Sequence, residues 1–136
     1  MEDELSLVAR AGHPLADRES LSETDLAGAR WVLPERGTPT REALEAALER
    51  RGFASPRIRV ETTDLTITRG LLIESDMLTA ASPHLFRQEI EARQLGLLRF
   101  ALPETRSAVG ILQRNGGSLS LPARLLMDSI REVGRV

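Results

Sequence analysis

Few residues of this 136-residue chain stand at a spacing that could support catalysis. Two acidic pairs, Glu61 with Asp64 and Glu74 with Asp76, could in principle act as a general acid and a general base. His13 lies in a Gly-His-Pro turn, with no carboxylate or second histidine at a motif spacing. A solvated surface and a helix cap explain the acidic pairs better than chemistry does, so we predict that the chain is not an enzyme.

Motifs of the common catalytic and metal sites are also absent. There is no Gly-x-Ser-x-Gly elbow, no phosphate loop, no dinucleotide fingerprint and no His-Glu-x-x-His. The chain has no cysteine, which excludes a disulfide framework, a thiolate metal site and a cysteine nucleophile. We therefore expect no catalytic residue, no metal ion and no cofactor.

The stretch best suited to ligand binding is a turn between a strand and a helix. A β-type run, Trp31–Leu33, breaks at Pro34, a polar turn with Gly37 follows, and a helix begins. Thr38 suits the N-cap and Pro39 the first helical position. The free N–H groups and the positive dipole end of such a helix can hold an anion. Ordinary strand–loop–helix connections that bind nothing have the same pattern, so both interpretations stay open.

Strand and helix patterns alternate along the rest of the chain. Leu65–Thr68 fits either a helix capped by Asp64 or a strand, and Asn115–Gly117 reads as a flexible turn. The other segments are strands at 5–9, 31–33, 57–62, 77–81, 97–100 and 109–112, and helices at 22–27, 39–51, 65–72, 83–90 and 120–133.

This alternation predicts an α/β layered fold with a mainly parallel sheet, because parallel strands need helical crossovers. Ligands of such folds gather at the carboxyl ends of the strands. The turn at residues 34–41 and a second turn at 81–83 both lie there, and Ser82 repeats the cap-before-proline pattern. His84, in the first turn of the following helix, is expected on the surface.

Composition limits the possible partners. The net charge of -2 gives no basic footprint for nucleic acid, and the aromatic content of 3% argues against a base-stacking surface. No apolar run approaches membrane-spanning length, and the acidic start Met1–Glu4 is unlike a signal peptide. We expect a cytoplasmic protein that contacts no membrane.

Several short motifs together resemble the effector-binding (substrate-binding) domain of LysR-type transcriptional regulators. The run Leu7–Ala16 (LVARAGHPLA) is similar to the strand and "HPLA" turn of that domain, and Asp25–Pro34 (DLAGARWVLP) to its "DL…WV-P" stretch. The nearest branch resembles the galactose-binding-protein and aromatic-acid regulators. Further matches in the same order are Gly37–Arg41, Arg51–Phe53, Ser75–Leu78, Gly96–Leu98 and Arg114.

The resemblance implies a type 2 periplasmic-binding-protein-like fold, in which two α/β lobes hold an effector in a cleft. Residues 12–95 would be the complete second lobe, 5–11 and 97–100 the crossing strands, and 105–136 the closing part of the first lobe. The family's effector contacts from the second lobe carry over onto Pro34, Glu35, Gly37 and Thr38, with Ser82 as a further candidate.

Two parts of the family's pattern have no counterpart in this sequence, namely the winged helix-turn-helix with its linker and the opening half of the first lobe. We therefore expect the C-terminal half of a regulator: a ligand-sensing module that does not bind DNA by itself. Its effector would be a small polar or anionic molecule such as a sugar, a sugar acid or an aromatic acid. Residues 105–136 should repack on the lobe, pair with a second chain as a homo-oligomer, or fray, because Val109, Ile111 and Leu126 need a partner surface. The alternative is a stand-alone interaction or dimerisation module with no small ligand.

Overall fold

The computed structural model describes residues 2–114 and 116–134, so Asn115 of the predicted turn lies outside the described residues. The chain divides into two units, one formed by residues 4–106 and the other by residues 1–3 and 107–136. Among the described helices, none combines the length and the apolar character that a membrane span requires.

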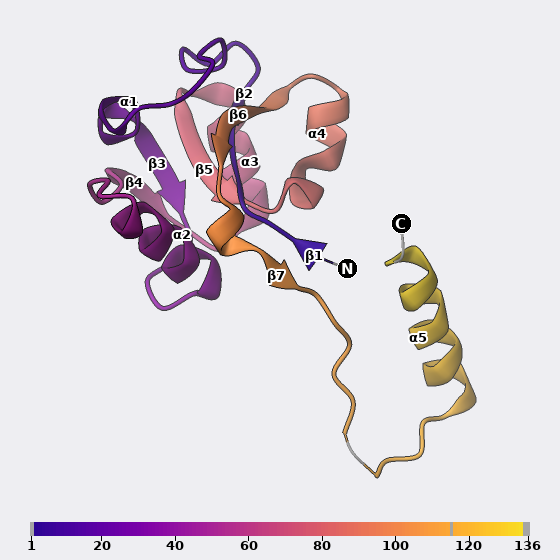
Figure 1. The fold of residues 1–136 in the computed structure, drawn as a ribbon. Helices are drawn as coiled ribbons and strands as arrows, with labels where there is room; N and C mark the ends of the chain where they lie inside the picture. Colours follow the sequence, from indigo (N-terminus) through magenta and orange to yellow (C-terminus); the bar gives the residue numbers. More distant parts are fainter. Residues whose placement is uncertain (1, 115, 135–136) are drawn as a thin grey trace. The chain divides into compact units, whose positions relative to one another are not determined.

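A five-stranded sheet in the order β4-β3-β5-β2-β6 forms the centre of the unit at residues 4–106 (Figure 1). β3 is parallel to β4 and to β5, whereas β2 is antiparallel to β5 and to β6. The strands are β2 (Ser6–Arg10), β3 (Arg30–Leu33), β4 (Ile58–Glu61), β5 (Met77–Ala81) and β6 (Leu95–Ala101).

The α/β class is confirmed, but the prediction of a mainly parallel sheet is wrong for half of the strand pairings. Helical crossovers α2 and α3 do connect the parallel strands β3, β4 and β5, as the alternation requires. The first strand of the unit, β2, instead lies between β5 and β6 and runs against both. The alternation of strand and helix segments in the sequence predicts crossover connections, but it does not predict the position of the first strand in the sheet order.

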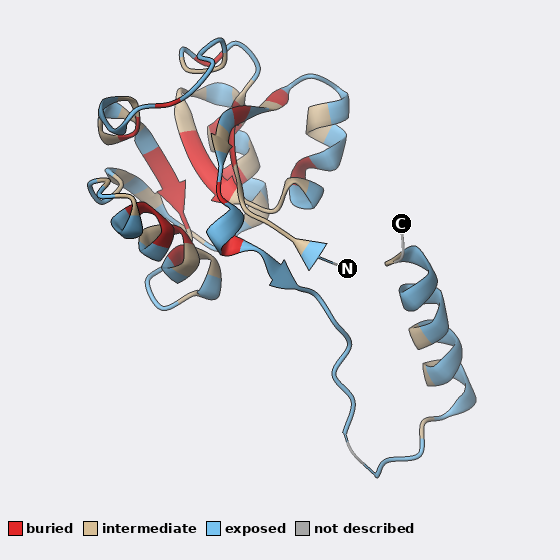
Figure 2. Cartoon of the chain, in the orientation of Figure 1, coloured by how far each residue is buried: buried red, intermediate tan, exposed pale blue. Residues whose placement is uncertain are grey.

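Helices cover both faces of this sheet, and buried residues line each face (Figure 2). Leu7 and Trp31 point to the face covered by α1 (Glu23–Gly28) and α2 (Pro39–Arg50), where Leu26, Leu44 and Leu48 complete one core cluster. The intervening residues Val8 and Val32 point to the opposite face, where α3 (Leu65–Glu74) supplies Leu72 and the segment η1 (Pro83–Phe86) with α4 (Arg87–Glu91) supplies Phe86. Side chains alternate across a strand, so the apolar runs of β2 and β3 fill both layers.

Asp64 and Ser82 cap the helical segments that follow them, as predicted. Asp64 accepts hydrogen bonds from the amides of Thr66 at 2.7 Å and Ile67 at 3.1 Å, so residues 65–68 form helix and the strand alternative is wrong. The predicted helix after Ser82 begins as the 3-10 turn η1 and becomes α-helical at Arg87.

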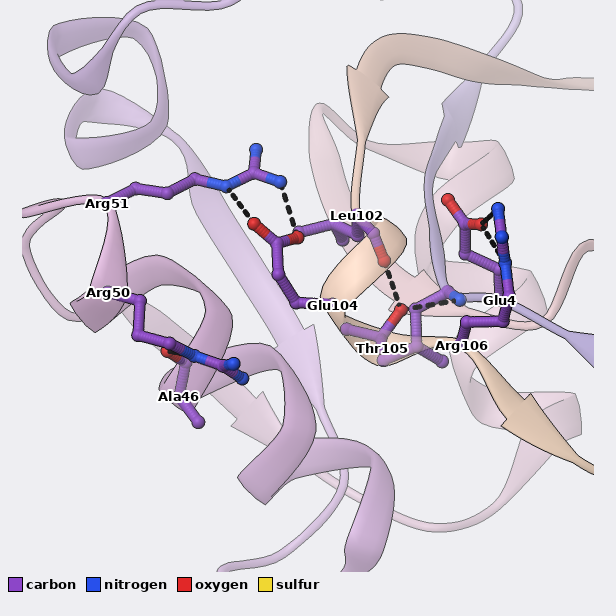
Figure 3. A network of polar contacts seen from close by, with 9 residues as sticks. Glu4, Ala46, Arg50, Arg51, Leu102, Glu104, Thr105 and Arg106 are labelled. Atoms are coloured by element: carbon purple, nitrogen blue, oxygen red, sulfur yellow. Dashed lines mark hydrogen bonds and ion pairs between the residues drawn. The ribbon is translucent and has the colours of Figure 1, made fainter.

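The exit of β6 is tied to the start of β2 and to the end of α2 (Figure 3). In the 3-10 turn η2 (Pro103–Thr105), the Thr105 hydroxyl accepts from the Leu5 amide at 3.0 Å and donates to the Leu102 carbonyl at 2.7 Å. Arg106 donates to Glu4 at 3.0 Å. On the other side, Arg51 makes a bidentate pair with Glu104, and its guanidinium lies 5.0 Å from the centre of the Phe100 ring.

In the other unit, β1 (Glu2–Asp3) pairs antiparallel with β7 (Ser107–Ala108), and α5 spans Leu121–Val133. The predicted strand at 109–112 is wrong, since β7 ends at Ala108. A strand needs a neighbour for its N–H and C=O groups, and within the described part of this unit β1 offers two residues only. α5 carries Leu121, Leu125, Leu126 and Ile130 at helical spacing, and no described element of its own unit covers them.

Candidate functional site

Three loops begin at one edge of the sheet, because β4, β3 and β5 run parallel. Leu33 pairs with Glu61 of β4, and Trp31 pairs with Leu78 of β5, so the strands end at similar levels. The loops at Pro34 and Ser82 were both predicted from the sequence as carboxyl-end loops. A third loop, from Thr62 to the Asp64 cap of α3, joins them at this edge.

The loop from Pro34 to Thr38 is a tight polar turn. Glu35 and Gly37 are exposed, whereas Pro34 and Thr38 are half-buried. The amide and the hydroxyl of Thr38 both donate to the Glu35 carbonyl, at 3.3 Å and 2.8 Å. Gly37 has a φ of +84°, a conformation that costs little only for glycine. One glycine and one threonine within the turn therefore contribute to its backbone conformation.

This turn leaves the N-terminus of α2 without a side-chain cap. Thr38 occupies the N-cap position and Pro39 the first helical turn, as predicted. The expected hydrogen bond from a helix amide to the Thr38 hydroxyl is wrong, because that hydroxyl is directed to the Glu35 carbonyl instead. The first-turn amides of α2 thus keep their donor capacity, and the positive end of the helix dipole is not offset by a cap.

Ser82 caps η1 directly after β5. Its hydroxyl accepts from the His84 amide at 3.3 Å, and the residue is half-buried. His84 itself is exposed and lies 3.1 Å from Arg87, between Nδ1 and Nη2, which agrees with its predicted surface position. Ser82 therefore lies at the same edge as the Pro34 loop and presents a polar atom there.

Asp76, from one of the acidic pairs, and His13 take part in hydrogen bonds that hold the fold together. Asp76 accepts from Arg10 at 2.8 Å, and this hydrogen bond lowers the pKa of its carboxyl group below the usual range. His13 is buried, accepts from the Leu15 amide at Nδ1 (3.1 Å), and therefore donates from Nε2 to the Asp76 carbonyl at 3.2 Å. Across residues 2–114 and 116–134, no group of three potential ligands could hold a metal ion.

One buried charge next to the loop was missed by the sequence analysis. Arg41, in the first turn of α2, is 1% exposed and donates to the Pro34 carbonyl at 3.0 Å. A signal was present, because Arg41 stands three residues before Leu44 and seven before Leu48 and so falls on the apolar stripe of α2. A cation on such a stripe has to find polar partners in the interior.

Residues 1–135 match the LysR substrate binding domain family. The HTH-type transcriptional regulator GalR of Pseudomonas putida is 41% identical over 133 residues, which are 98% of this chain and 33% of that protein. Two solved structures share the fold. The CcmR regulatory domain of Synechocystis PCC6803 in complex with 2-PG has a TM-score of 0.73 at 20% identity, over 98% of this chain and 64% of that one. The effector binding domain of QuiR in complex with shikimate has a TM-score of 0.64 at 14% identity, over 98% of this chain and 62% of that one.

The chain thus spans about a third of the length of GalR and just under two thirds of each regulatory domain. The match covers both units, and the motifs that carried the resemblance lie on the elements where the fold requires them: the HPLA turn after β2, the WV-P run on β3 and its loop. The chain belongs to the LysR substrate binding domain family.

Proposed function

We propose that this chain is the effector-sensing part of a LysR-type transcriptional regulator and that it binds a small polar or anionic molecule. The observation that carries the proposal is the N-terminus of α2, which lacks a side-chain cap and lies at the carboxyl edge of the sheet. In this proposal Pro34, Glu35, Gly37 and Thr38 contact the effector, and Ser82 contributes from the neighbouring loop.

The proposal includes a division into lobes. Residues 12–95 form the second lobe, residues 5–11 and 97–100 cross between lobes, and residues 105–136 belong to the first lobe. Two observations support it: the chain divides near residue 106, and it covers only 64% and 62% of two regulatory domains. The rest of the cleft wall would come from a region with no counterpart in these residues.

The effector is proposed to carry a carboxylate, a phosphate or several hydroxyl groups. Backbone amides at a helix N-terminus bind oxygen atoms that bear negative charge, and their binding energy is greatest for anions. The solved relatives are complexes with 2-PG and with shikimate, which is consistent with acids of this size. Sugars, sugar acids and aromatic acids are the classes to test first.

A thermal melt of the chain, repeated with a panel of sugars, sugar acids and aromatic acids that includes shikimate, tests the proposal. A ligand that binds only the folded state increases the free energy of unfolding, by about 2.7 kcal/mol at a concentration of 100 times its Kd, and so raises the melting temperature. A rise with one class and not with the others would support the sensor. A cooperative melt that no member shifts, both for this chain and for a chain extended upstream to the full regulatory domain, would contradict it.

A second candidate function is an interaction module, and the apolar side of α5 favours it. Leu125 is 60% exposed and Leu126 is 62% exposed, as is expected for a surface that another polypeptide covers.

We propose that the chain forms a homo-oligomer and acts in the cytoplasm. We also propose that it is not an enzyme and that other regions of the regulator bind DNA. Light scattering of the chain tests self-association, and a gel-shift assay should show no DNA binding by residues 1–136.

A further inference from the structure

The most unusual side chain near the proposed effector loop is Arg41. It is the third residue of α2, and its side chain is fully buried. Arginine is seldom buried, because removing its charge from water is costly unless the interior supplies partners. The partners of Arg41 therefore indicate what it does in the fold.

The guanidinium joins three different segments. Nε donates to Glu45 one turn further along α2, at 2.5 Å. Nη1 donates to the carbonyl of Pro34, the first residue of the loop, at 3.0 Å, and lies 3.4 Å from the carboxylate of Glu61, the last residue of β4. One side chain thus connects the helix, the loop before it and the end of the neighbouring strand.

Burial alone does not explain an arginine here. Its position on the apolar stripe of α2, with Leu44 and Leu48, could hold an apolar residue, and replacing a buried ion pair by apolar residues is often neutral or stabilising. An apolar residue could not bond to the Pro34 carbonyl. The planar fork of arginine can meet a backbone carbonyl and carboxylates at once. Its Nη2 is buried with no hydrogen-bond partner among the described residues, so Nε and Nη1 make the contacts to Pro34, Glu45 and Glu61.

We propose that Arg41 is a positioning residue for the effector loop. It fixes the Pro34 carbonyl against α2 and β4, so that the turn from Glu35 to Thr38 presents the amides of the α2 N-terminus in one geometry. The inference rests on the proposed function for the meaning of the loop, whereas the contacts themselves do not depend on any ligand. A fixed geometry lowers the ordering cost that a ligand would otherwise meet on binding.

Amide hydrogen exchange of the free chain tests this role for Arg41→Met. Two amides report on the loop and its surroundings: Thr38, which bonds to the Glu35 carbonyl, and Thr62, which bonds to the Leu33 carbonyl at 2.9 Å. Ala11 and Ala16, which bond to Gln94 and His13 at 2.9 Å and 2.8 Å, report on the opposite end of the sheet. We expect exchange about 10-fold faster at Thr38 and Thr62, since a hydrogen bond from a charged group is lost, and unchanged exchange at Ala11 and Ala16.

The matched control is Arg69→Met, which removes an arginine of α3 that pairs with Glu89. It should leave exchange at Thr38 and Thr62 unchanged. If Arg41→Met does not fold, Arg41→Lys takes its place, because a lysine keeps the charge but not the fork that spans Pro34, Glu45 and Glu61. Buried Trp31, the one tryptophan, reports by fluorescence whether each variant is folded.

The inference is overturned if a folded Arg41 variant leaves Thr38 and Thr62 unchanged, or if all four amides accelerate together. The first result would mean that the loop keeps its conformation without the Arg41 contacts. The second would mean that Arg41 contributes only to the stability of the whole unit. Failure of the proposed function is a separate outcome. In that case the loop amides accelerate as expected, while no effector shifts the melt of the unaltered chain or of its upstream extension.

Discussion

Replacing Thr38 by aspartate should affect stability and effector binding in opposite directions. The substitution removes the hydroxyl bond to the Glu35 carbonyl, which contributes about 1 kcal/mol. It supplies a carboxylate that can cap α2, worth about 1 kcal/mol, and places negative charge at the positive end of the dipole, worth about 0.3–1 kcal/mol. The free energy of unfolding should therefore stay the same or rise by up to about 1 kcal/mol.

The same carboxylate should repel an anionic effector bound at the α2 amides. Two like charges about 4 Å apart interact by about 1 kcal/mol in bulk water and about 4 kcal/mol near a protein surface, so the Kd should rise between about 5-fold and several hundred-fold. Thr38→Asn is the matched control, because asparagine also caps helices and adds no charge.

The assay is a urea melt of each variant, followed by calorimetric titration with the panel member that stabilises the unaltered chain most. Binding that is equally tight in Thr38→Asp and Thr38→Asn would refute the placement of the anion at this helix end. A loss of more than about 2 kcal/mol of stability in Thr38→Asp would refute the description of the turn, since it would exceed the single hydroxyl bond that is removed.

Four further outcomes are expected. Gly37→Ala should lower the free energy of unfolding by about 1–2 kcal/mol in a urea melt, because φ is +84° there; an unchanged midpoint would mean that the turn relaxes. Leu44→Ala should cost about 2–5 kcal/mol by calorimetry, since Leu44 is fully buried in the core under α2, and a loss below about 1 kcal/mol would contradict that packing. The hydrogen bond from Arg51 lowers the pKa of Glu104 below its ordinary value of 4.5, so its stabilising contribution to folding is present above pH 4.5 and is lost as the pH falls through the lower folded pKa. Glu104→Gln should therefore reduce the loss of stability between pH 6 and pH 3 in thermal melts, and parallel stability curves of the two proteins would contradict this. Leu126→Asp should reduce self-association in light scattering without changing the melt of residues 4–106, and an unchanged mass distribution would exclude the apolar side of α5 as the contact.

Local patterns predicted the individual elements of the larger unit well. Asp64 and Ser82 mark helix starts because their side-chain oxygens bond to amides two or three residues ahead, an interaction that needs no distant partner. The same locality explains why the LysR-type motifs were recognisable, and the family is confirmed by the match over residues 1–135.

Properties that depend on distant partners were predicted poorly. Whether residues 109–112 form a strand depends on a neighbour, and the described part of their unit has none beyond β1. The position of β2 between β5 and β6 likewise cannot be predicted from the alternation of strand and helix segments. At the candidate site, a local competitor was missed instead. Thr38 has the right type and position for a cap, yet its hydroxyl donates to the Glu35 carbonyl three residues back. The site assignment to residues 34–38 and Ser82 stays a prediction.

The pairing of Glu4 with Arg106 has a practical consequence. The chain enters and leaves the sheet unit at adjacent points, held by this ion pair and by the Leu5 amide on Thr105 (Figure 3). A segment whose two ends meet can be excised, transplanted into a loop of another protein or circularly permuted, because joining its ends strains nothing. A short glycine linker from Arg106 to Glu4, with new termini in the exposed stretch at Ala54 and Ser55, would give a permuted form of the unit at residues 4–106 with the same sheet.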